Sequence, residues 1–221
     1  MNAIRNVALL LALLVLADMF VNTDAWRRRR RRNPPPPPPP PSPPPPCHPP
    51  ALPSTYRWYN QWGGSFNVKC PAGSTLSMIR SLYSRCHHDR VFSFACKYSR
   101  LSYTTGSEVC NWSSSYVNSY LGAMSFTCPG NGFVAGVHSE HSNSAGDRRF
   151  KFKCCSRLNV QRYGCYTTGH INDYQQIFHY ALPHGTYLAG VESHFNASKR
   201  DRLWKLRICG ARVRLCKWSL I

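Results

Sequence analysis

The sequence predicts an all-β fold, a disulfide-rich single domain of three β-hairpin repeats with pseudo-threefold symmetry. Three observations predict it. From Tyr56 onward, short runs of alternating apolar and polar residues are separated by Gly- and Ser-rich turns, and no apolar pattern at helical spacing exceeds two turns. Eleven cysteines in 221 residues favour disulfide bonds. Finally, one stretch of sequence recurs three times.

The repeat is marked by an Asp-Arg dipeptide followed, one residue later, by an aromatic residue. Cys70 precedes the first such Asp by 19 residues, and Cys128 precedes the second by the same 19. The three dipeptides are Asp89-Arg90, Asp147-Arg148 and Asp201-Arg202. Each copy is predicted to form two strands, with the joining loops at residues 83–88, 141–146 and 195–200.

The second strand of each copy should alternate between core and surface, because successive residues of a strand point to opposite faces. The predicted core side chains are Phe92, Phe94, Cys96, Phe150, Phe152, Cys154, Trp204, Leu206 and Ile208. In the second and third copies the opposite face is basic, with Lys151, Lys153, Lys205 and Arg207, and with Arg149 and Arg202 nearby.

The repeat also suggests partners for eight of the eleven cysteines. Cys96 and Cys154 have core parity, and each has a partner at the matching point of its copy's first strand. Cys155 and Cys209 lie one residue further, on the other face, so each is matched to the one cysteine in the segment before its copy. The predicted bridges are Cys70–Cys96, Cys128–Cys154, Cys110–Cys155 and Cys165–Cys209. An exchange of Cys154 with Cys155 remains an alternative, and Cys47, Cys86 and Cys216 are left unassigned.

The segments before the repeats have compositions of their own. Residues 1–25 carry an apolar run of about 11 residues, which is typical of a secretory signal peptide ending at Ala25 and too short to span a bilayer. Residues 26–55 form a leader with a run of six arginines ending at Arg32 and a polyproline tract. The arginines are interpreted either as a processing site that ends a propeptide or as an arm that grips glycans. Residues 56–221 are expected to be the folded domain of a secreted protein without a transmembrane span.

The charge of the chain indicates its class of partner. The formal net charge is +19, and because residues 1–32 carry seven arginines and two acids, the remainder is still +14. A secreted domain this basic is expected to bind polyanions such as sulfated glycans, proteoglycans or anionic lipid at a cell surface. Nucleic acid is ranked low as a partner because a secreted protein lies outside the cell compartments that hold it. The predicted polyanion-binding residues are Arg149, Lys151, Lys153, Arg202, Lys205 and Arg207.

Several motifs together resemble the dermatopontin family. They are Cys70-Pro-Ala-Gly73, Gly132-Phe-Val-Ala-Gly136, and the Cys-Cys pair that follows the second Asp-Arg copy. The resemblance covers about residues 56–216. It implies a secreted matrix protein that binds dermatan-sulfate proteoglycans, integrins and collagen. Invertebrate members include shell-matrix proteins, agglutinins and a cytotoxin of cnidarian stinging capsules.

The leader, residues 26–55, indicates which kind of family member to expect. A signal peptide, a basic run and a cysteine beside polyproline resemble the layout of stinging-capsule proteins. The first hypothesis is therefore a non-enzymatic secreted cytotoxin, stored in nematocysts, that binds cell surfaces through a basic face. The alternative is an extracellular-matrix adhesion protein that binds proteoglycans, integrins or collagen, or a component of a mineralised matrix.

Enzymatic and metal chemistry find little support in the sequence. No Ser-His-Asp or Cys-His set can be placed together, so no catalytic residue and no cofactor are predicted. His87-His88 and the pair His138 and His141 are a weak metal signal, and no metal site is predicted.

The repeated Asp-Arg dipeptides and the glycosylation sequons each leave two interpretations open. The Asp-Arg dipeptides stand where each loop turns into the second strand of its copy. They either contact a glycan or receptor, or they fix this corner, with the aspartate capping loop amides or pairing with a neighbouring arginine. The second interpretation is favoured, because folding geometry demands such repetition. Asn111-Trp-Ser and Asn196-Ala-Ser are predicted N-glycosylation sites, and the alternative is that these sequons carry no glycan.

Overall fold

The structure is a computed structural model that describes residues 47–99 and 107–214. The predicted signal peptide with its end at Ala25, the processing site at Arg32, and Cys216 lie outside the described residues. Within the described part the chain forms strands and turns and no helix. Among these same residues no helix is long and apolar enough to cross a membrane.

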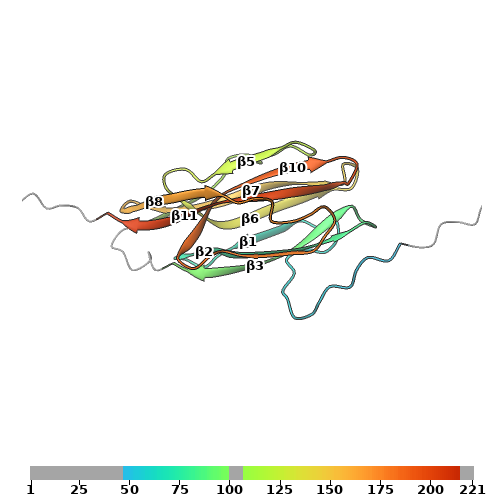
Figure 1. The fold of residues 1–221 in the computed structure, drawn as a ribbon, viewed down its shortest axis with the longest axis horizontal. Helices are drawn as coiled ribbons and strands as arrows, with labels where there is room; N and C mark the ends of the chain where they lie inside the picture. Colours follow the sequence, from blue (N-terminus) through green and yellow to red (C-terminus); the bar gives the residue numbers. More distant parts are fainter. Residues whose placement is uncertain (1–46, 100–106, 215–221) are drawn as a thin grey trace, which may run out of the picture. The chain divides into compact units, whose positions relative to one another are not determined.

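The eleven strands follow the predicted hairpins closely (Figure 1). Each long hairpin joins two strands of ten or more residues, and the Asp of each Asp-Arg dipeptide is the first residue of the second strand. The strands are β1 (Phe66–Lys69), β2 (Ser74–Ser84), β3 (Asp89–Tyr98), β4 (Glu108–Trp112), β5 (Met124–Thr127), β6 (Phe133–Ser142), β7 (Asp147–Arg157), β8 (Val160–Thr167), β9 (Phe178–Ala181), β10 (Thr186–Asn196) and β11 (Asp201–Val213).

The strands form three sheets, each built on one hairpin. We call them the first-hairpin sheet, in the order β3-β2-β9; the second-hairpin sheet, β1-β6-β7-β4; and the third-hairpin sheet, β5-β10-β11-β8. The short strand next to each hairpin comes from elsewhere in the sequence. β1 pairs with the second hairpin, β5 with the third, and β9 returns to the first. The three sheets are thereby linked in a closed cycle.

The three hairpins correspond residue by residue. Each has a bulge at the same point of its first strand, between Leu76 and Met78, between Val134 and Gly136, and between Leu188 and Gly190. Each also has a residue with positive φ directly before its Asp, namely His88, Gly146 and Arg200. The same backbone path is therefore used three times.

Aromatic side chains from the three hairpins meet in the core. Phe92, Phe150 and Trp204 occupy equivalent positions and pack edge to face, with ring centroids 5.1 to 6.2 Å apart. All three are buried. This geometry suits aromatic quadrupoles, and the larger of the two described core clusters contains residues of all three hairpins.

Five disulfides staple the described residues. Four of them join the pairs that the repeat predicts: Cys70–Cys96, Cys128–Cys154, Cys110–Cys155 and Cys165–Cys209. The fifth joins Cys47 to Cys86, which the repeat left unassigned, and it ties the chain before the first repeat to the first hairpin turn.

One predicted core residue is on the surface. Cys154 and Ile208 are buried, whereas Cys96, at the equivalent position of the first hairpin, is exposed. The prediction that Cys96 lies in the core was therefore wrong. The reason is that the first-hairpin sheet has three strands, so nothing in the described chain covers the outer side of β3 at this point.

Candidate functional site

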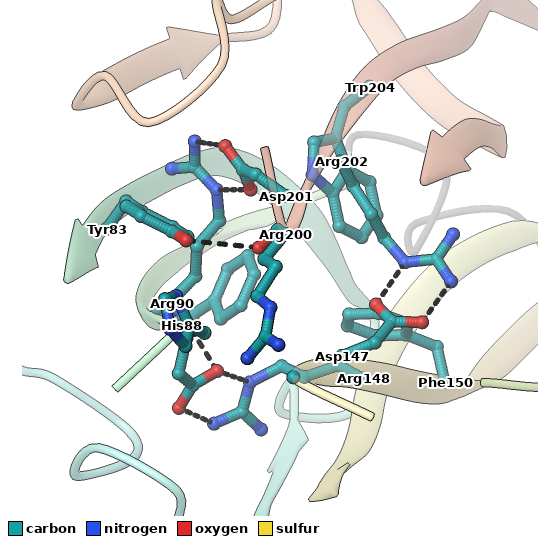
Figure 2. A pocket seen from close by; sticks show the side chains of 13 residues that line it. Tyr83, His88, Arg90, Asp147, Arg148, Phe150, Arg200, Asp201, Arg202 and Trp204 are labelled. Carbon is teal, nitrogen blue, oxygen red and sulfur yellow. Dashed lines mark hydrogen bonds and ion pairs between the residues drawn. The ribbon is translucent and has the colours of Figure 1, made fainter. Parts of the chain in front are cut away.

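The three Asp-Arg dipeptides form a cyclic set of buried ion pairs at the hairpin turns (Figure 2). The Arg148 guanidinium donates to Asp89, with Nε 2.6 Å from Oδ1. In the same way Arg202 pairs with Asp147 and Arg90 with Asp201, each through two hydrogen bonds of 2.6 to 2.7 Å. Every arginine thus binds the aspartate of another repeat, and the cycle closes. Paired charges in bidentate geometry are what burial of these groups requires.

Each aspartate of this Asp-Arg cycle also holds a loop. Its Oδ2 accepts a backbone N–H from the residue 26 positions earlier: Gly63, Leu121 or Gln175, each with positive φ. The carboxylates therefore cap loop amides and pair with arginines at once. The structural interpretation of the dipeptides accounts for the described hydrogen bonds of the three carboxylates, and the one further contact is His141 Nε2, 3.7 Å from Asp89 Oδ1.

Arg202 must consequently be removed from the predicted polyanion-binding set. Its side chain is 4 % exposed, and its donors go to Asp147 and to the Gly122 carbonyl. A guanidinium whose hydrogen bonds are satisfied inside the protein cannot also bind a surface ligand. The cavity inside the Asp-Arg cycle measures about 20 Å³, room for roughly one water molecule, and Arg200 points into it (Figure 2).

The four remaining strand cations of the predicted set lie on two sheets rather than on one face. Lys151 and Lys153 are half-buried on β7 of the second-hairpin sheet, and Lys205 and Arg207 are half-buried on β11 of the third-hairpin sheet. We call these two surfaces the outer basic faces. Their side chains alternate with core residues along each strand, as the sequence pattern predicts.

Arg149 sits beside the second-hairpin basic face in a polar cluster. Its guanidinium donates to Glu140 Oε2 at 2.8 Å and lies over the Tyr116 ring, 3.9 Å from the centroid. Lys151 Nζ lies 5.0 Å from the same centroid. Hydrogen bonds from Tyr116, Arg149 and His138, with the charge of Arg149, hold the pKa of Glu140 at about 2, well below its usual range. Arg149 is thus a partly neutralised member of the predicted set.

This cluster has a measurable pH dependence. The folded-state pKa of Glu140 is depressed, so its contribution to stability is present above the unfolded pKa of about 4.5 and is lost as pH falls through about 2. Tyr116→Phe removes the largest cause of the depression and is expected to raise the Glu140 pKa toward its usual range. A carboxyl-carbon NMR titration measures this. Tyr120→Phe is the control, because Tyr120 contacts Arg149 rather than Glu140; equal shifts in both variants would contradict the assignment.

The third-hairpin basic face carries a cluster of like charges. Arg162, on β8, lies near Arg207, and burial and then that neighbouring charge lower its pKa. Its guanidinium donates to the Cys128 carbonyl at 2.6 Å. Glu192 stands directly opposite Lys205 in the strand register but forms no ion pair with it within 4.0 Å. This face therefore keeps an excess of positive charge.

The internal ion pairs leave the described surface strongly basic. The described residues contain nineteen Lys and Arg and seven Asp and Glu. Five of the seven carboxylates pair with arginines, three in the Asp-Arg cycle and two at Glu140 and Glu108. Fourteen cations then face two remaining carboxylates, Asp173 and Glu192. The potential outside the domain is consequently positive.

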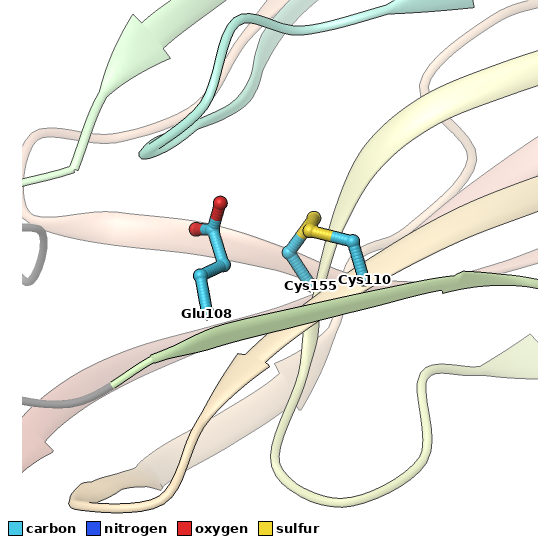
Figure 3. Close-up of side chains that lie close together, drawn as sticks. All are labelled: Glu108, Cys110 and Cys155. Atoms are coloured by element: carbon cyan, nitrogen blue, oxygen red, sulfur yellow. A yellow bond between two sulfur atoms is a disulfide. The ribbon is translucent and has the colours of Figure 1, made fainter.

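Neither the histidines nor the cluster of one glutamate with two cysteines assembles a metal centre in the described residues. His141 is buried with Nε2 3.7 Å from Asp89, and His138 contacts Tyr116 and Glu140, so the two belong to different neighbourhoods. Glu108 lies next to Cys110 and Cys155, but Figure 3 shows these two sulfurs joined in a disulfide, so neither is available as a thiolate ligand.

The two glycosylation sequons lie at different kinds of surface. Asn196 ends β10, where its Oδ1 accepts the Lys199 N–H. Asn111 is exposed on β4 and lines a cavity of about 410 Å³, whose wall has serines, apolar side chains and no charged one. Glycosylation at both sites stays a prediction.

One set of structural residues escaped the sequence analysis. Asn60, Asn118 and Asn172 are buried, and each clamps the second strand of a hairpin: the amide donates to the carbonyl of the Asp-Arg arginine, and Oδ1 accepts an N–H two residues later. The signal was present, since each asparagine precedes its aspartate by 29 residues.

The fold and the site together define a class: a disulfide-linked all-β domain of three interlocked hairpins, held by an Asp-Arg cycle and basic on its surface. Residues 60–213 match the family model for dermatopontin. This match covers most of the chain, and the protein belongs to the dermatopontin family.

Individual relatives agree with that assignment. The chain is 32% identical to the hemagglutinin/amebocyte aggregation factor of Limulus polyphemus over 154 residues, 69% of this chain and 86% of that protein. It is 34% identical to Millepora cytotoxin-1 of Millepora dichotoma over 150 residues, 68% of this chain and 65% of that protein. It is 31% identical to human dermatopontin over 157 residues, 69% and 76% of the two chains. No solved structure matches the fold.

Proposed function

We propose that this protein is secreted and binds sulfated glycans at cell surfaces through its two outer basic faces. The observation that carries the proposal is the charge balance. The ion pairs of the fold consume five of seven carboxylates and leave Lys151, Lys153, Lys205 and Arg207 without a carboxylate partner within 4.0 Å among the described residues. A regular sheet spaces such cations along a rigid surface, which favours a repeating polyanion.

Two biological uses of this binding are open to test. Similarity to a cytotoxin from Millepora supports a non-enzymatic cytotoxin, with storage in nematocysts as part of that proposal. Similarity to dermatopontins supports an adhesion protein of the extracellular matrix that binds proteoglycans, integrins or collagen, or belongs to a mineralised matrix. Adding the purified secreted protein to cultured cells separates the two: cell death supports the first use, and retention on the matrix without harm supports the second.

The binding surface is tested with two variants that lose the same number of positive charges at different places on the surface. In one variant Lys151, Lys153, Lys205 and Arg207 are each changed to Gln; in the matched control the exposed Arg57, Arg85, Lys199 and Arg214 are changed to Gln. We expect the first variant to elute from a heparin column at clearly lower salt than the wild type. A site with fewer charges attracts the sulfated chain less strongly, so a lower salt concentration suffices to screen that attraction. The control removes equal net charge and should shift less.

Equal shifts in the two variants would contradict the proposal, because net charge rather than the outer basic faces would then set the affinity. Circular dichroism and the melting temperature of both variants verify that they are folded, which matters for Arg207 because its Nε is buried.

A further inference from the structure

The first-hairpin sheet has one open edge. In the other two sheets the second strand of the hairpin is covered by a further strand, β4 on β7 and β8 on β11. In the first-hairpin sheet β3 is the last strand, and no described residue pairs with it in a ladder on its outer side. In Figure 1, β3 is the lowest of the labelled strands.

Proline explains why this strand is missing. The repeat interval of 58 residues between Asp89 and Asp147 places the counterpart of β4 at residues 50–54, which are Pro-Ala-Leu-Pro-Ser. Proline has no N–H to donate to a ladder. The structure assigns no strand there. The cysteine pair that anchors the edge strand elsewhere is absent as well, since Leu52 and Lys97 stand at the positions of Cys110 and Cys155.

The loss leaves backbone groups without partners. In the second hairpin, both backbone groups of Phe152 are hydrogen-bonded to Ser113: the Phe152 N–H donates to Ser113 Oγ, and the Phe152 carbonyl accepts the Ser113 N–H. Leu206 and Thr168 repeat this arrangement in the third hairpin. Phe94 is the equivalent residue of the first hairpin.

The segment that precedes β1 runs beside β3 at Phe92 but does not reach the backbone groups of Phe94. Asn60 and Tyr59 pair with the N–H and carbonyl of Phe92, and the chain then turns away, so that Tyr56 lies against Arg80 of β2. Alternate residues of a strand direct their N–H and C=O groups to the same side. Phe94 and Cys96 therefore present backbone donors and acceptors to the open edge, with no partner among the described residues.

The open edge is rigid and flanked by positive charge. The Cys70–Cys96 disulfide fixes β3 to the end of β1, so little conformational freedom is lost when a ligand binds. Lys69 and Lys97, each next in sequence to one of the bridged cysteines, are exposed. These charges disfavour pairing of β3 with a second copy of this basic chain and favour a negatively charged strand.

We propose that the open edge of β3, at Phe94 and Cys96, binds an acidic peptide in extended conformation. The peptide adds as a fourth strand, in the place that β4 and β8 fill in the other sheets. Backbone hydrogen bonds to Phe94 and Cys96 supply affinity, and contacts of acidic side chains with Lys69 and Lys97 supply selectivity.

Hydrogen exchange of the full secreted protein tests the proposal. The probe is a short synthetic peptide of alternating Glu and Val. In the free protein we expect the amides of Phe94 and Cys96 to exchange faster than those of Phe152 and Leu206. With saturating peptide their exchange should slow by about tenfold or more, because the N–H groups become bonded in a ladder.

Matched probes and variants separate strand pairing from plain charge attraction. The same peptide with its alternate amides N-methylated keeps its charge but cannot complete the ladder, and it should lose binding. Lys69→Glu with Lys97→Glu should weaken binding by about tenfold. The variant with Gln at 151, 153, 205 and 207 should bind like the wild type, so the proposed glycan-binding faces can fail without affecting this result.

Three results would overturn the proposal. Phe94 and Cys96 amides already protected in the free monomer would mean that the chain covers its own edge. Equal binding of the N-methylated peptide would mean that charge alone attracts it. A dimer, seen by light scattering, with those two amides protected would mean that the edge serves self-association instead.

Discussion

Asp147→Ala is expected to lower the free energy of unfolding by about 3–5 kcal/mol, because it leaves the Arg202 guanidinium buried without its carboxylate. The arginine keeps its hydrogen bond to the Gly122 carbonyl but loses both bonds to Asp147, and the Leu121 N–H loses its acceptor as well. Chemical denaturation with the disulfides intact measures the loss. Asp173→Ala, at an exposed carboxylate, is the control and should change stability by less than about 0.5 kcal/mol.

A double variant separates the cost of the unpaired buried charge from the cost of the lost hydrogen bonds. Asp147→Ala with Arg202→Met removes both members of the pair, and it should recover a substantial part of the lost stability. A cost below about 1 kcal/mol for Asp147→Ala alone would show that the Asp-Arg cycle does not support the fold.

Phe150→Ala should destabilise the domain by a similar amount, about 3–5 kcal/mol, through the cavity that it leaves. Phe150 is 2 % exposed and touches aromatic rings from both other hairpins, with centroids 6.2 Å from Phe92 and 5.1 Å from Trp204. Since all three hairpins share this ring, its loss should lower the melting temperature of the whole domain while unfolding remains a single cooperative transition in calorimetry. Leu158→Ala is the control, because Leu158 is 94 % exposed. A separate unfolding step of the second hairpin in Phe150→Ala would contradict a shared core.

The hairpins and their core residues could be predicted because their signals are local. Alternation along Phe150, Phe152 and Cys154 reports which face is buried, and the repeat fixes where the strands turn. The exposure of Cys96 could not be found in that way, because it depends on whether another segment covers the strand. The same holds for Arg202: its position beside the basic face suggested a ligand contact, whereas its partner Asp147 lies in another repeat.

The pairing of the short strands was also beyond the sequence. β1, β5 and β9 have four residues each, too few for a reliable period, and each pairs with a hairpin of another repeat. The buried asparagines are different. Asn60, Asn118 and Asn172 recur at one spacing from the Asp-Arg dipeptides, so the repeat in the sequence already contained this signal.

The closed cycle of sheets governs how the chain can fold as it is synthesised. The first hairpin is complete once Tyr98 has been made, but its partner strand β9 begins only at Phe178. In a solenoid each repeat contacts its neighbours and can be added in turn. Here the last repeat supplies the strand that completes the first, so folding must await nearly the whole domain. A chain that stops after the second hairpin lacks both the third aromatic ring of the core and the strand that the first hairpin requires.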